Sequence, residues 1–157
     1  MTREEIFMQE AIDLSLKGIT LNEGGPFGCV IVKNDIIVGR GNNMVTSTND
    51  PTAHAEVVAI RDACKNLNSF QLDDCEVYTS CEPCPMCLGA IYWARPRVIY
   101  FANNRQDAAD AGFDDSMIYE EMAANIETRK IPIKCLGREE ALKVFTQWKN
   151  KEDKTAY

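Results

Sequence analysis

The sequence predicts an α/β fold with three layers, in which a mixed five-stranded sheet carries helices on both faces. After an initial helix and a hairpin, strand-like and helix-like segments alternate along the chain, which is typical of this class. The 157 residues are 45% hydrophobic and 26% charged, an ordinary composition for one globular domain. We find no internal repeat, linker or low-complexity segment, so we expect a single domain over residues 1–157.

The first half of the chain predicts a helix, a hairpin and a second helix. The expected elements are a helix over Glu5–Leu21, strands over Cys29–Val32 and Ile36–Val38, a loop over 42–51 and a helix over Ala53–Leu67. Gly24-Gly25-Pro26 interrupts the helical spacing of apolar residues. Asn34-Asp35 lies between two β-branched runs and predicts a hairpin turn. Thr52 is a favoured N-cap residue and predicts the start of the second helix.

The second half continues the alternation of strands and helices. The expected elements are a strand over Glu76–Thr79, a helix over Cys84–Ala94, a strand over Val98–Phe101, a polar loop to Gly112, a helix over Ser116–Ala124, a strand over Ile131–Leu136 and a helix over Glu139–Lys149. Pro85 suits a first helical turn, and Arg95-Pro96 ends that helix. The run that begins at Ile131 supplies the fifth strand of the predicted sheet.

Two short motifs predict a metal site. An H-x-E motif begins at His54, and a P-C-x-x-C motif begins at Pro83. Catalytic zinc has three protein ligands and one open position, and His54, Cys84 and Cys87 supply these three ligands. The two cysteines share one face of a predicted helix start, where the helix N-terminus favours the thiolate that binds metal. Glu56 is left free to move protons, and the expected cofactor is Zn²⁺.

These residues also have structural interpretations. A single His is more often packed or exposed than a ligand, and a Cys in an apolar chain is usually a small buried hydrophobe. Cys81, Cys84 and Cys87 form a C-x2-C-x2-C run, which is compatible with an iron–sulfur cluster or a closed structural zinc site. A closed zinc site needs a fourth ligand, and cysteines alone do not explain the H-x-E motif. We expect Cys81 to be a structural thiol, although spacing alone leaves a ligand role open.

The ligand set predicts replacement of an exocyclic amine by oxygen. Zinc lowers the pKa of a bound water toward neutrality. Glu56 lies two residues from His54, so on an ideal helix it points in another direction and reaches that water from the side. It would take a proton from the water, deliver it to a ring nitrogen and help the amine leave as ammonia. The alternative from another functional class is a non-catalytic, zinc-stabilised binding module.

The chain resembles the zinc-dependent deaminases of the cytidine-deaminase-like superfamily, and more narrowly the bacterial guanine deaminases. The resembling segments are residues 24–28, Asn42-Asn43, residues 50–56, residues 79–94, residues 111–116 and Tyr157. The zinc motif is specific to the superfamily, whereas residues 111–116 and the C-terminus indicate the guanine deaminases. The resemblance implies a three-layer cytidine-deaminase-like fold and conversion of guanine to xanthine by attack at C2.

The resemblance also implies roles for further residues. It implies that Asp115 is a second acid or base near the leaving amine and that Asn43 hydrogen-bonds the base. The implied substrate-binding residues are Phe27, Asn43, Ala55, Trp93, Phe113 and Tyr157. Each of these roles has a structural alternative. Phe27 and Trp93 are also typical core residues, Asp115 is a favoured helix cap, and Tyr157 is compatible with a disordered chain end.

The resemblance implies a homodimer in which the C-terminal segment 139–157 is exchanged between subunits. This exchange would bring Tyr157 to the neighbouring active site. Val144, Phe145 and Trp148 lie close to the end of the chain, and such large apolar groups need a partner surface. Packing of this helix on the chain's own sheet is the alternative.

Charge and composition bear on partners and location. The formal net charge is −7 and the pI about 4.8, which disfavours a nucleic-acid partner because phosphate contacts need Lys and Arg. We therefore expect a small purine base, with tRNA adenosine deaminases and free cytosine or cytidine deaminases as rival assignments. No apolar stretch approaches about 18 residues, so no membrane partner is expected. The absence of a secretory signal and seven cysteines without a disulfide pattern predict a cytoplasmic protein.

Overall fold

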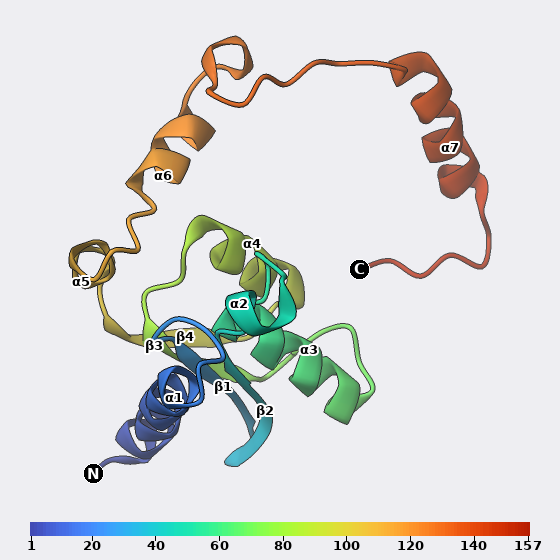
Figure 1. Ribbon diagram of the computed structural model, residues 1–157. Helices are drawn as coiled ribbons and strands as arrows, with labels where there is room; N and C mark the ends of the chain where they lie inside the picture. Colours follow the sequence, from blue (N-terminus) through green and yellow to red (C-terminus); the bar gives the residue numbers. More distant parts are fainter. The chain divides into compact units, whose positions relative to one another are not determined.

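The computed structural model describes residues 1–157, which divide into two compact units, 1–115 and 116–157. The first unit contains the sheet and its covering helices, and the second contains helices joined by irregular chain (Figure 1). None of the helices is both long and apolar enough to cross a membrane.

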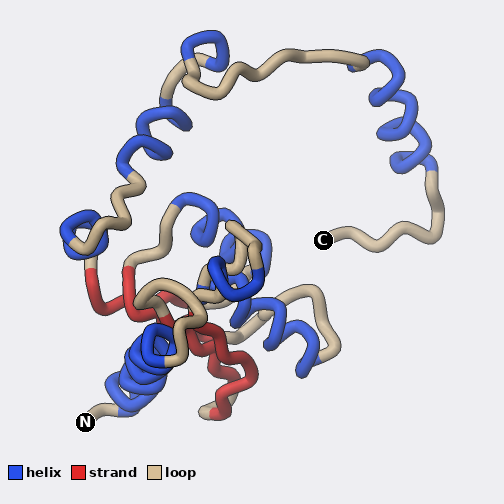
Figure 2. The backbone as a smooth tube through the Cα atoms, in the orientation of Figure 1, coloured by secondary structure: helices blue, strands red, loops and turns tan.

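The first unit is built on a four-stranded mixed sheet with strand order β2-β1-β3-β4. Its elements are α1 (Arg3–Thr20), β1 (Gly28–Lys33), β2 (Ile36–Asn42), α2 (Val45–Thr48), α3 (Ala55–Leu67), β3 (Glu76–Cys81), α4 (Pro85–Ala94), β4 (Val98–Asn103) and α5 (Arg105–Asp110). β1 runs antiparallel to β2 and β3, whereas β3 and β4 are parallel. Figure 2 shows the strands of this sheet in red. Asn34 and Asp35 form the hairpin turn with φ values of 50° and 62°, which matches the prediction.

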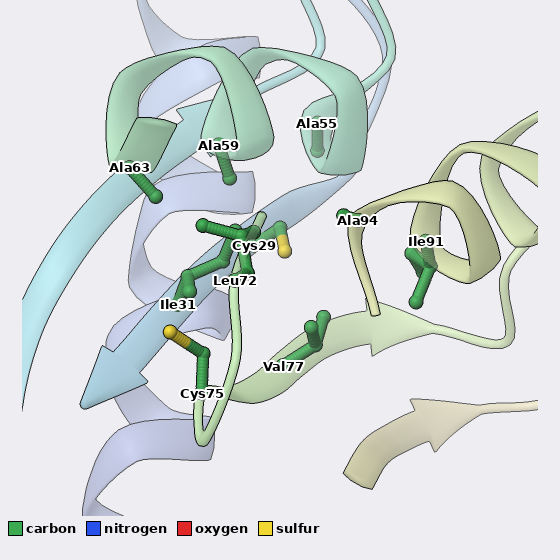
Figure 3. Packing of buried hydrophobic residues seen from close by; sticks show 10 residues of the cluster. All are labelled: Cys29, Ile31, Ala55, Ala59, Ala63, Leu72, Cys75, Val77, Ile91 and Ala94. Atoms are coloured by element: carbon green, nitrogen blue, oxygen red, sulfur yellow. The ribbon is translucent and has the colours of Figure 1, made fainter. Parts of the chain in front are cut away.

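Helices cover both faces of this sheet, so the three-layer prediction is confirmed. One core joins β1 and β3 to α3 and α4, and it consists of Cys29, Ile31, Ala55, Ala59, Ala63, Leu72, Cys75, Val77, Ile91 and Ala94 (Figure 3). On the other face, α1 covers a second core of Ala11, Val30, Val32 and Tyr78. Residues of β1 alternate between the two cores because successive side chains of a strand point to opposite faces.

Two glycines of β2 let α3 approach the sheet closely. A Cβ atom on Gly41 would lie 2.3 Å from the carbonyl oxygen of Ala55, and one on Gly39 would lie 2.5 Å from that of Ala59. Real Cβ atoms do not approach backbone this closely, so only glycine fits at these two positions. The contact at Gly41 fixes the first turn of α3 against the sheet, directly after His54.

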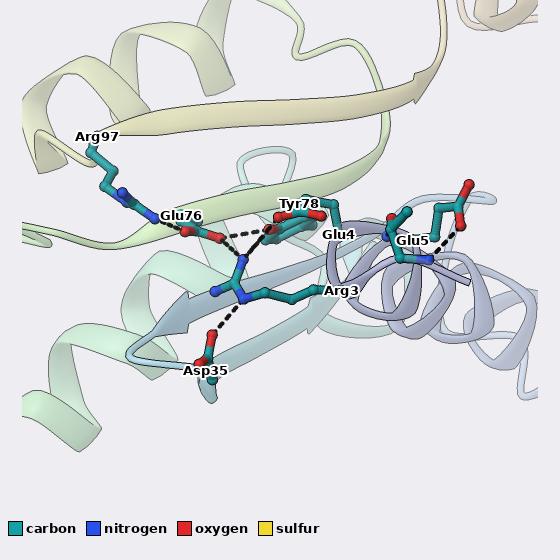
Figure 4. A network of polar contacts seen from close by, with 8 residues as sticks. Arg3, Glu4, Glu5, Asp35, Glu76, Tyr78 and Arg97 are labelled. Atoms are coloured by element: carbon teal, nitrogen blue, oxygen red, sulfur yellow. Dashed lines mark hydrogen bonds and ion pairs between the residues drawn. The ribbon is translucent and has the colours of Figure 1, made fainter.

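A polar network around the buried carboxylate of Glu76 lies at the N-terminal end of β3 (Figure 4). The Glu76 side chain accepts hydrogen bonds from the Tyr78 hydroxyl at 2.6 Å and from Arg3 Nη1 at 2.9 Å. It also pairs with the Arg97 guanidinium, and Arg3 pairs with Asp35. The Glu76 carboxylate, only 3% exposed, therefore has cationic partners from both α1 and the segment before β4.

The second unit contains α6 (Ser116–Ala123), a short 3₁₀ helix (Ile126–Thr128) and α7 (Arg138–Asn150). Neither α6 nor α7 has a buried residue. Large apolar side chains in α7 remain exposed, among them Phe145 at 67% and Trp148 at 44%. This unit therefore has no apolar core of its own.

The prediction of a fifth strand over Ile131–Leu136 was wrong, and the sheet has four strands. These residues form no strand in the structure. Pro132 lacks the N–H that a ladder requires, and the second unit contains no other strand for pairing. Apolar composition alone does not make a strand without a hydrogen-bonding partner.

Two short helices lie inside segments that the sequence predicted as loops. α2 occupies part of the predicted loop over 42–51, and α5 occupies part of the polar segment before Gly112. α5 begins with a reciprocal capping box, in which the side chains of Asn104 and Asp107 each accept a hydrogen bond from the other's backbone N–H. The Asn-x-x-Asp spacing was a usable signal for this helix.

Candidate active site

Two helix N-termini supply the predicted metal ligands. His54 is the N-cap residue of α3 and Cys84 is the N-cap residue of α4. Neither side chain makes a capping hydrogen bond, so both are available for another partner. The predicted cap at Thr52 was wrong, because its N–H and hydroxyl both bond to Asp50 Oδ1, at 2.8 and 2.6 Å. This turn ends just before His54 and positions His54 at the start of α3.

The three predicted ligands come together. His54 Nδ1 lies 3.5 Å from the Sγ atoms of both Cys84 and Cys87, and the three ligand atoms all lie within 4.8 Å of one another. A tetrahedral zinc site, with Zn–N of about 2.0–2.1 Å and Zn–S of about 2.3 Å, places N and S about 3.6 Å apart. The cluster therefore has the composition and the spacing that zinc requires.

The local electrostatics favour a thiolate at this cluster. A hydrogen bond from Cys87 lowers the pKa of the Cys84 thiol well below its ordinary value, and His54 lowers it further. Donating that hydrogen bond, together with burial, raises the pKa of Cys87. The positive end of the α4 dipole acts in the same direction on Cys84. One anionic ligand is therefore stabilised by the fold itself.

Cys81 lies outside this cluster. Its thiol is 3.8 Å from the carbonyl oxygen of Asn104, and it is not among the residues that converge as ligands. Burial raises the pKa of Cys81 to about 11, and the negative charge of Glu56 adds to that effect. The geometry thus separates Cys81 from the other two cysteines of the C-x2-C-x2-C run.

Glu56 lies beside the cluster as a buried carboxylate. It is 6% exposed and accepts a hydrogen bond at 2.9 Å from the hydroxyl of Thr79, on β3. Burial raises its pKa, while hydrogen bonds from Thr79 and Cys87 partly offset that shift. A buried carboxylate with few hydrogen bonds is suited to exchange protons near neutral pH.

An aromatic and polar wall surrounds Gly25, and the loop that carries Asn43 bonds to the segment before His54. The rings of Phe27 and Phe113 meet edge to face at a centroid distance of 5.0 Å. Gly25 lies beside both rings, because a Cβ there would be 3.1 Å from Phe113 and 3.3 Å from Phe27. The Gly25 N–H donates to Asn43 Oδ1 at 3.3 Å. Three of the predicted substrate-binding residues therefore meet around one glycine.

The amide of Asn43 has a fixed orientation. Its Oδ1 accepts hydrogen bonds from the backbone N–H groups of Gly25 and Val45, at 3.3 and 3.1 Å. Since two backbone donors hold the oxygen, Nδ2 is left as a donor. The next residue, Met44, donates its N–H to the carbonyl of Ala53 at 2.9 Å. This bond places the Asn43 loop against the segment that carries His54.

The remaining predicted residues fall into two groups. Ala55 is fully buried in the core at the start of α3. Burial raises the pKa of Asp115, and the negative charge of Cys84 adds to that effect. Trp93 is 64% exposed and lies six residues from Cys87, on another face of α4. Tyr157 is 71% exposed and belongs to the second unit. Trp93 therefore does not share a helix face with Cys87.

Sequence reasoning missed Thr79 and the structural role of Gly25. Thr79 was predicted only as part of a strand. Its position was nevertheless a usable signal, because alternation puts it on the same face as Val77, where a polar residue among apolar neighbours needs a partner. Gly25 was treated as a helix breaker, and no sequence signal indicated its contact with the two phenylalanine rings.

Comparison with known proteins agrees with this site. Residues 1–103 match the family described as the cytidine and deoxycytidylate deaminase zinc-binding region. Guanine deaminase of Bacillus subtilis is 54% identical over 153 residues, covering 98% of each chain. An X-ray structure of guanine deaminase from that organism superposes with a TM-score of 0.95 over 98% of each chain. The tRNA-specific adenosine deaminase of Streptococcus pyogenes serotype M18 is 41% identical over 107 residues, 68% of this chain and 67% of its own.

The fold, the ligand cluster and these similarities agree with one another. The family match covers both motifs of the cluster, from the H-x-E motif at His54 to the P-C-x-x-C motif at Pro83. The similarity to the bacterial guanine deaminase also includes the second unit. The chain therefore belongs to the cytidine and deoxycytidylate deaminase family, in the group that includes the bacterial guanine deaminases.

Proposed function

We propose that this protein is a zinc-dependent guanine deaminase that converts guanine and water to xanthine and ammonia. The observation that carries the proposal is the buried carboxylate of Glu56, which is not among the three converging ligands but interacts with one of them, Cys87. A closed structural metal site has four protein ligands and needs no such carboxylate. The substrate is supported by 54% identity over 98% of the chain to the Bacillus subtilis guanine deaminase.

His54, Cys84 and Cys87 would hold the zinc ion. Their N···S separations of 3.5 Å match a tetrahedral site, and two sulfurs with one imidazole are typical zinc ligands. When bound, zinc supplies a water molecule whose pKa is lowered toward neutrality and stabilises negative charge on its oxygen.

The protein's own groups would carry the proton transfers. Glu56 takes a proton from the attacking water and delivers it to a ring nitrogen of the base, while the oxygen bonds to C2. The second proton of the water, on the hydroxyl now bonded to C2, must then reach the amine, which leaves as ammonia as the C2–N bond breaks and the C2=O bond forms. Asp115 is our candidate for the group near that leaving amine, and the contribution of Cys84 to its raised pKa, after that of burial, supports a position near the ligands.

The wall beside the cluster would orient the base. Asn43 offers a donor from Nδ2, and guanine presents carbonyl and ring-nitrogen acceptors. Phe27 and Phe113 supply apolar contact surface, as purine pockets combine aromatic walls with a few fixed polar groups. Ala55, Trp93 and Tyr157 remain proposed substrate contacts, and the last two would have to reach the base from outside the ligand cluster.

Ammonia release from a panel of substrates tests the function. The panel consists of guanine, cytosine, cytidine, adenine and a tRNA anticodon stem-loop. We expect turnover with guanine, formation of xanthine, and little activity on the stem-loop, because a net charge of −7 repels a polyanion. Preference for the stem-loop would favour the tRNA adenosine deaminases, and preference for cytosine or cytidine would favour the pyrimidine enzymes. A zinc-loaded protein inactive on every substrate would favour the binding module.

We also propose a homodimer in which segment 139–157 is exchanged between subunits. Support comes from the second unit, which spans residues 116–157 and has no buried residue in either α-helix. About 40 residues without disulfides or metal rarely form a stable core. Phe145 and Trp148 therefore need a surface from elsewhere. In the exchanged arrangement, Tyr157 would help close the partner's active site over the base.

Mixing two inactive variants tests the exchange. One chain carries Glu56→Gln with a complete tail, and the other keeps Glu56 but lacks residues 154–157. If the tail serves the neighbouring subunit, a mixed dimer contains one complete site and some activity returns. If the tail serves its own subunit, no mixed dimer has a complete site. A monomeric protein in light scattering, or no rescue despite proven subunit exchange, would reject the proposal.

We propose a cytoplasmic location as well. None of the seven cysteines forms a disulfide, as is usual in a reducing compartment. Fractionation of cells that express the tagged protein would test this assignment, and recovery mainly outside the cytosolic fraction would contradict it.

A further inference from the structure

Thr79 is a buried hydroxyl that touches the proposed proton carrier. It is 1% exposed, and its Oγ1 lies 2.9 Å from Glu56 Oε1 and 3.1 Å from the carbonyl oxygen of Cys81. The two residues come from different elements, Thr79 from β3 and Glu56 from the first turn of α3. Their hydrogen bond therefore links the sheet directly to the carboxylate.

The sheet holds Thr79 firmly in place. β3 lies between β1 and β4, and Thr79 is paired with Cys29 on one side and with Phe101 on the other. The carbonyl of Cys81 limits the position of the Thr79 oxygen as well. A hydroxyl has one proton, so it can serve only one of its two acceptors at a time, and the ionised carboxylate is the stronger acceptor.

The position of the Glu56 carboxylate depends on this hydroxyl. Thr79 Oγ1 donates to Glu56 Oε1 at 2.9 Å, and both residues are buried. A buried carboxylate needs such donors, and this one comes from a central strand of the sheet.

We propose that Thr79 is a positioning residue that holds Glu56 in the orientation required for proton transfer. Its hydrogen bond occupies Oε1 and leaves Oε2 to exchange protons with the water and the base. This inference rests on the proposed function, in which Glu56 carries the proton. A reactive group must be fixed to within about 0.5 Å by its neighbours, and a small misplacement costs rate more than binding.

Two substitutions separate the hydroxyl from the shape of the side chain. Thr79→Val keeps the branched shape but removes the donor, whereas Thr79→Ser keeps the donor and removes a methyl group. We expect Thr79→Val to lower kcat about 10- to 100-fold with KM within about twofold, since its target is orientation rather than substrate binding. Thr79→Ser should keep most of kcat. Zinc content should stay at one per chain in both variants.

Ser80→Ala is the matched control. Ser80 is also buried in β3, and its hydroxyl accepts a hydrogen bond at 3.0 Å from the N–H of Gly28 rather than touching Glu56. Ser80→Ala should lower the melting temperature, because the buried N–H of Gly28 loses its partner, and it should leave kcat unchanged. If Thr79 were merely structural, Thr79→Val would resemble this control.

A double-mutant cycle tests whether Thr79 acts through Glu56. In the Glu56→Gln background, Thr79→Val should change the residual kcat by less than about threefold, because the group that it positions is gone. Equal fold losses in both backgrounds, or normal kcat in Thr79→Val with an active parent enzyme, would overturn the proposal and leave the proposed function intact. A parent enzyme that holds zinc but does not deaminate guanine would reject both.

Discussion

The buried polar groups at the two ends of β3 differ in how fully they are paired. At the N-terminal end, the Glu76 carboxylate has Arg3, Arg97 and the Tyr78 hydroxyl as partners. At the C-terminal end, Glu56 keeps one strong side-chain hydrogen bond, from Thr79. His54 has two sulfur neighbours and makes no capping bond.

We infer from this difference that the N-terminal end of β3 contributes to stability and that its C-terminal end contributes to the reaction. A buried charge that is fully paired resists change, because any alteration leaves a partner uncompensated. A buried charged group with unused hydrogen-bonding positions is less stable but can accept a proton or bind a ligand. The carboxyl ends of sheet strands are also where α/β proteins place their ligands. Four predictions test this comparison.

Removal of a metal ligand should have the largest effect. His54→Ala and Cys84→Ala should reduce zinc from one per chain to nearly none, with activity at background and lower solubility, because three ligands are needed to hold the ion. Metal analysis of purified protein measures this directly. Cys135→Ala, at an exposed cysteine outside the cluster, is the control and should keep its zinc. Full zinc occupancy in the two ligand variants would rule out the assigned metal site.

Loss of the proton carrier should come next. Glu56→Gln preserves shape but cannot shuttle a proton, so kcat should fall by about 10²–10⁴-fold while zinc content and fold persist. Steady-state kinetics alongside metal analysis separates this outcome from loss of the site. Turnover close to that of the parent enzyme would mean that another group carries the proton.

Asp115→Asn should have a smaller effect on rate. If Asp115 moves protons at the leaving amine, kcat should fall near the lower end of about 10²–10⁴-fold with little change in melting temperature. If Asp115 is only a helix cap, Asn replaces it well and kcat should stay normal. Asp114→Asn is the neighbouring control for a general change in charge. A normal kcat in Asp115→Asn would therefore remove Asp115 from the mechanism.

Disruption of the polar network at the other end of β3 should leave catalysis almost unchanged. Glu76→Gln removes the charge that Arg3 and Arg97 share, which should cost about 1–3 kcal/mol of unfolding free energy. For a chain of this size, each kcal/mol lowers the melting temperature by about 2–4 °C. Glu140→Gln is the control. It breaks an exposed ion pair with Lys143 and should change the melting temperature very little. A large loss of kcat in Glu76→Gln would contradict the inference that the N-terminal end of β3 serves stability alone.

Much of the fold followed from local patterns in the sequence. The hairpin at Asn34-Asp35 and the buried strands were predictable because turn residues and β-branched runs act over a few residues. The strand predicted over Ile131–Leu136 failed because a strand depends on a distant partner, which composition does not reveal. The helix α5 was missed although its capping pair, Asn104 and Asp107, was visible in the sequence.

The candidate site was predictable where spacing alone brings residues together. Cys84 and Cys87 share a helix face for that reason, and the H-x-E motif supplied the other ligand. The bond between Thr79 and Glu56 could not be predicted, since it depends on how α3 lies across β3. The fixed amide of Asn43 likewise depends on the path of the backbone at Gly25.

Gly41 affects the geometry of the candidate metal site although it supplies no ligand. A methyl group there would lie 2.3 Å from the Ala55 carbonyl, so α3 would have to shift away from the sheet. His54 precedes Ala55 and would move with it, while the two sulfurs belong to α4 and would stay. The distances from His54 Nδ1 to the two sulfurs, both 3.5 Å, would then change. The absence of one side chain in β2 thus helps to hold the three ligand atoms at their spacing.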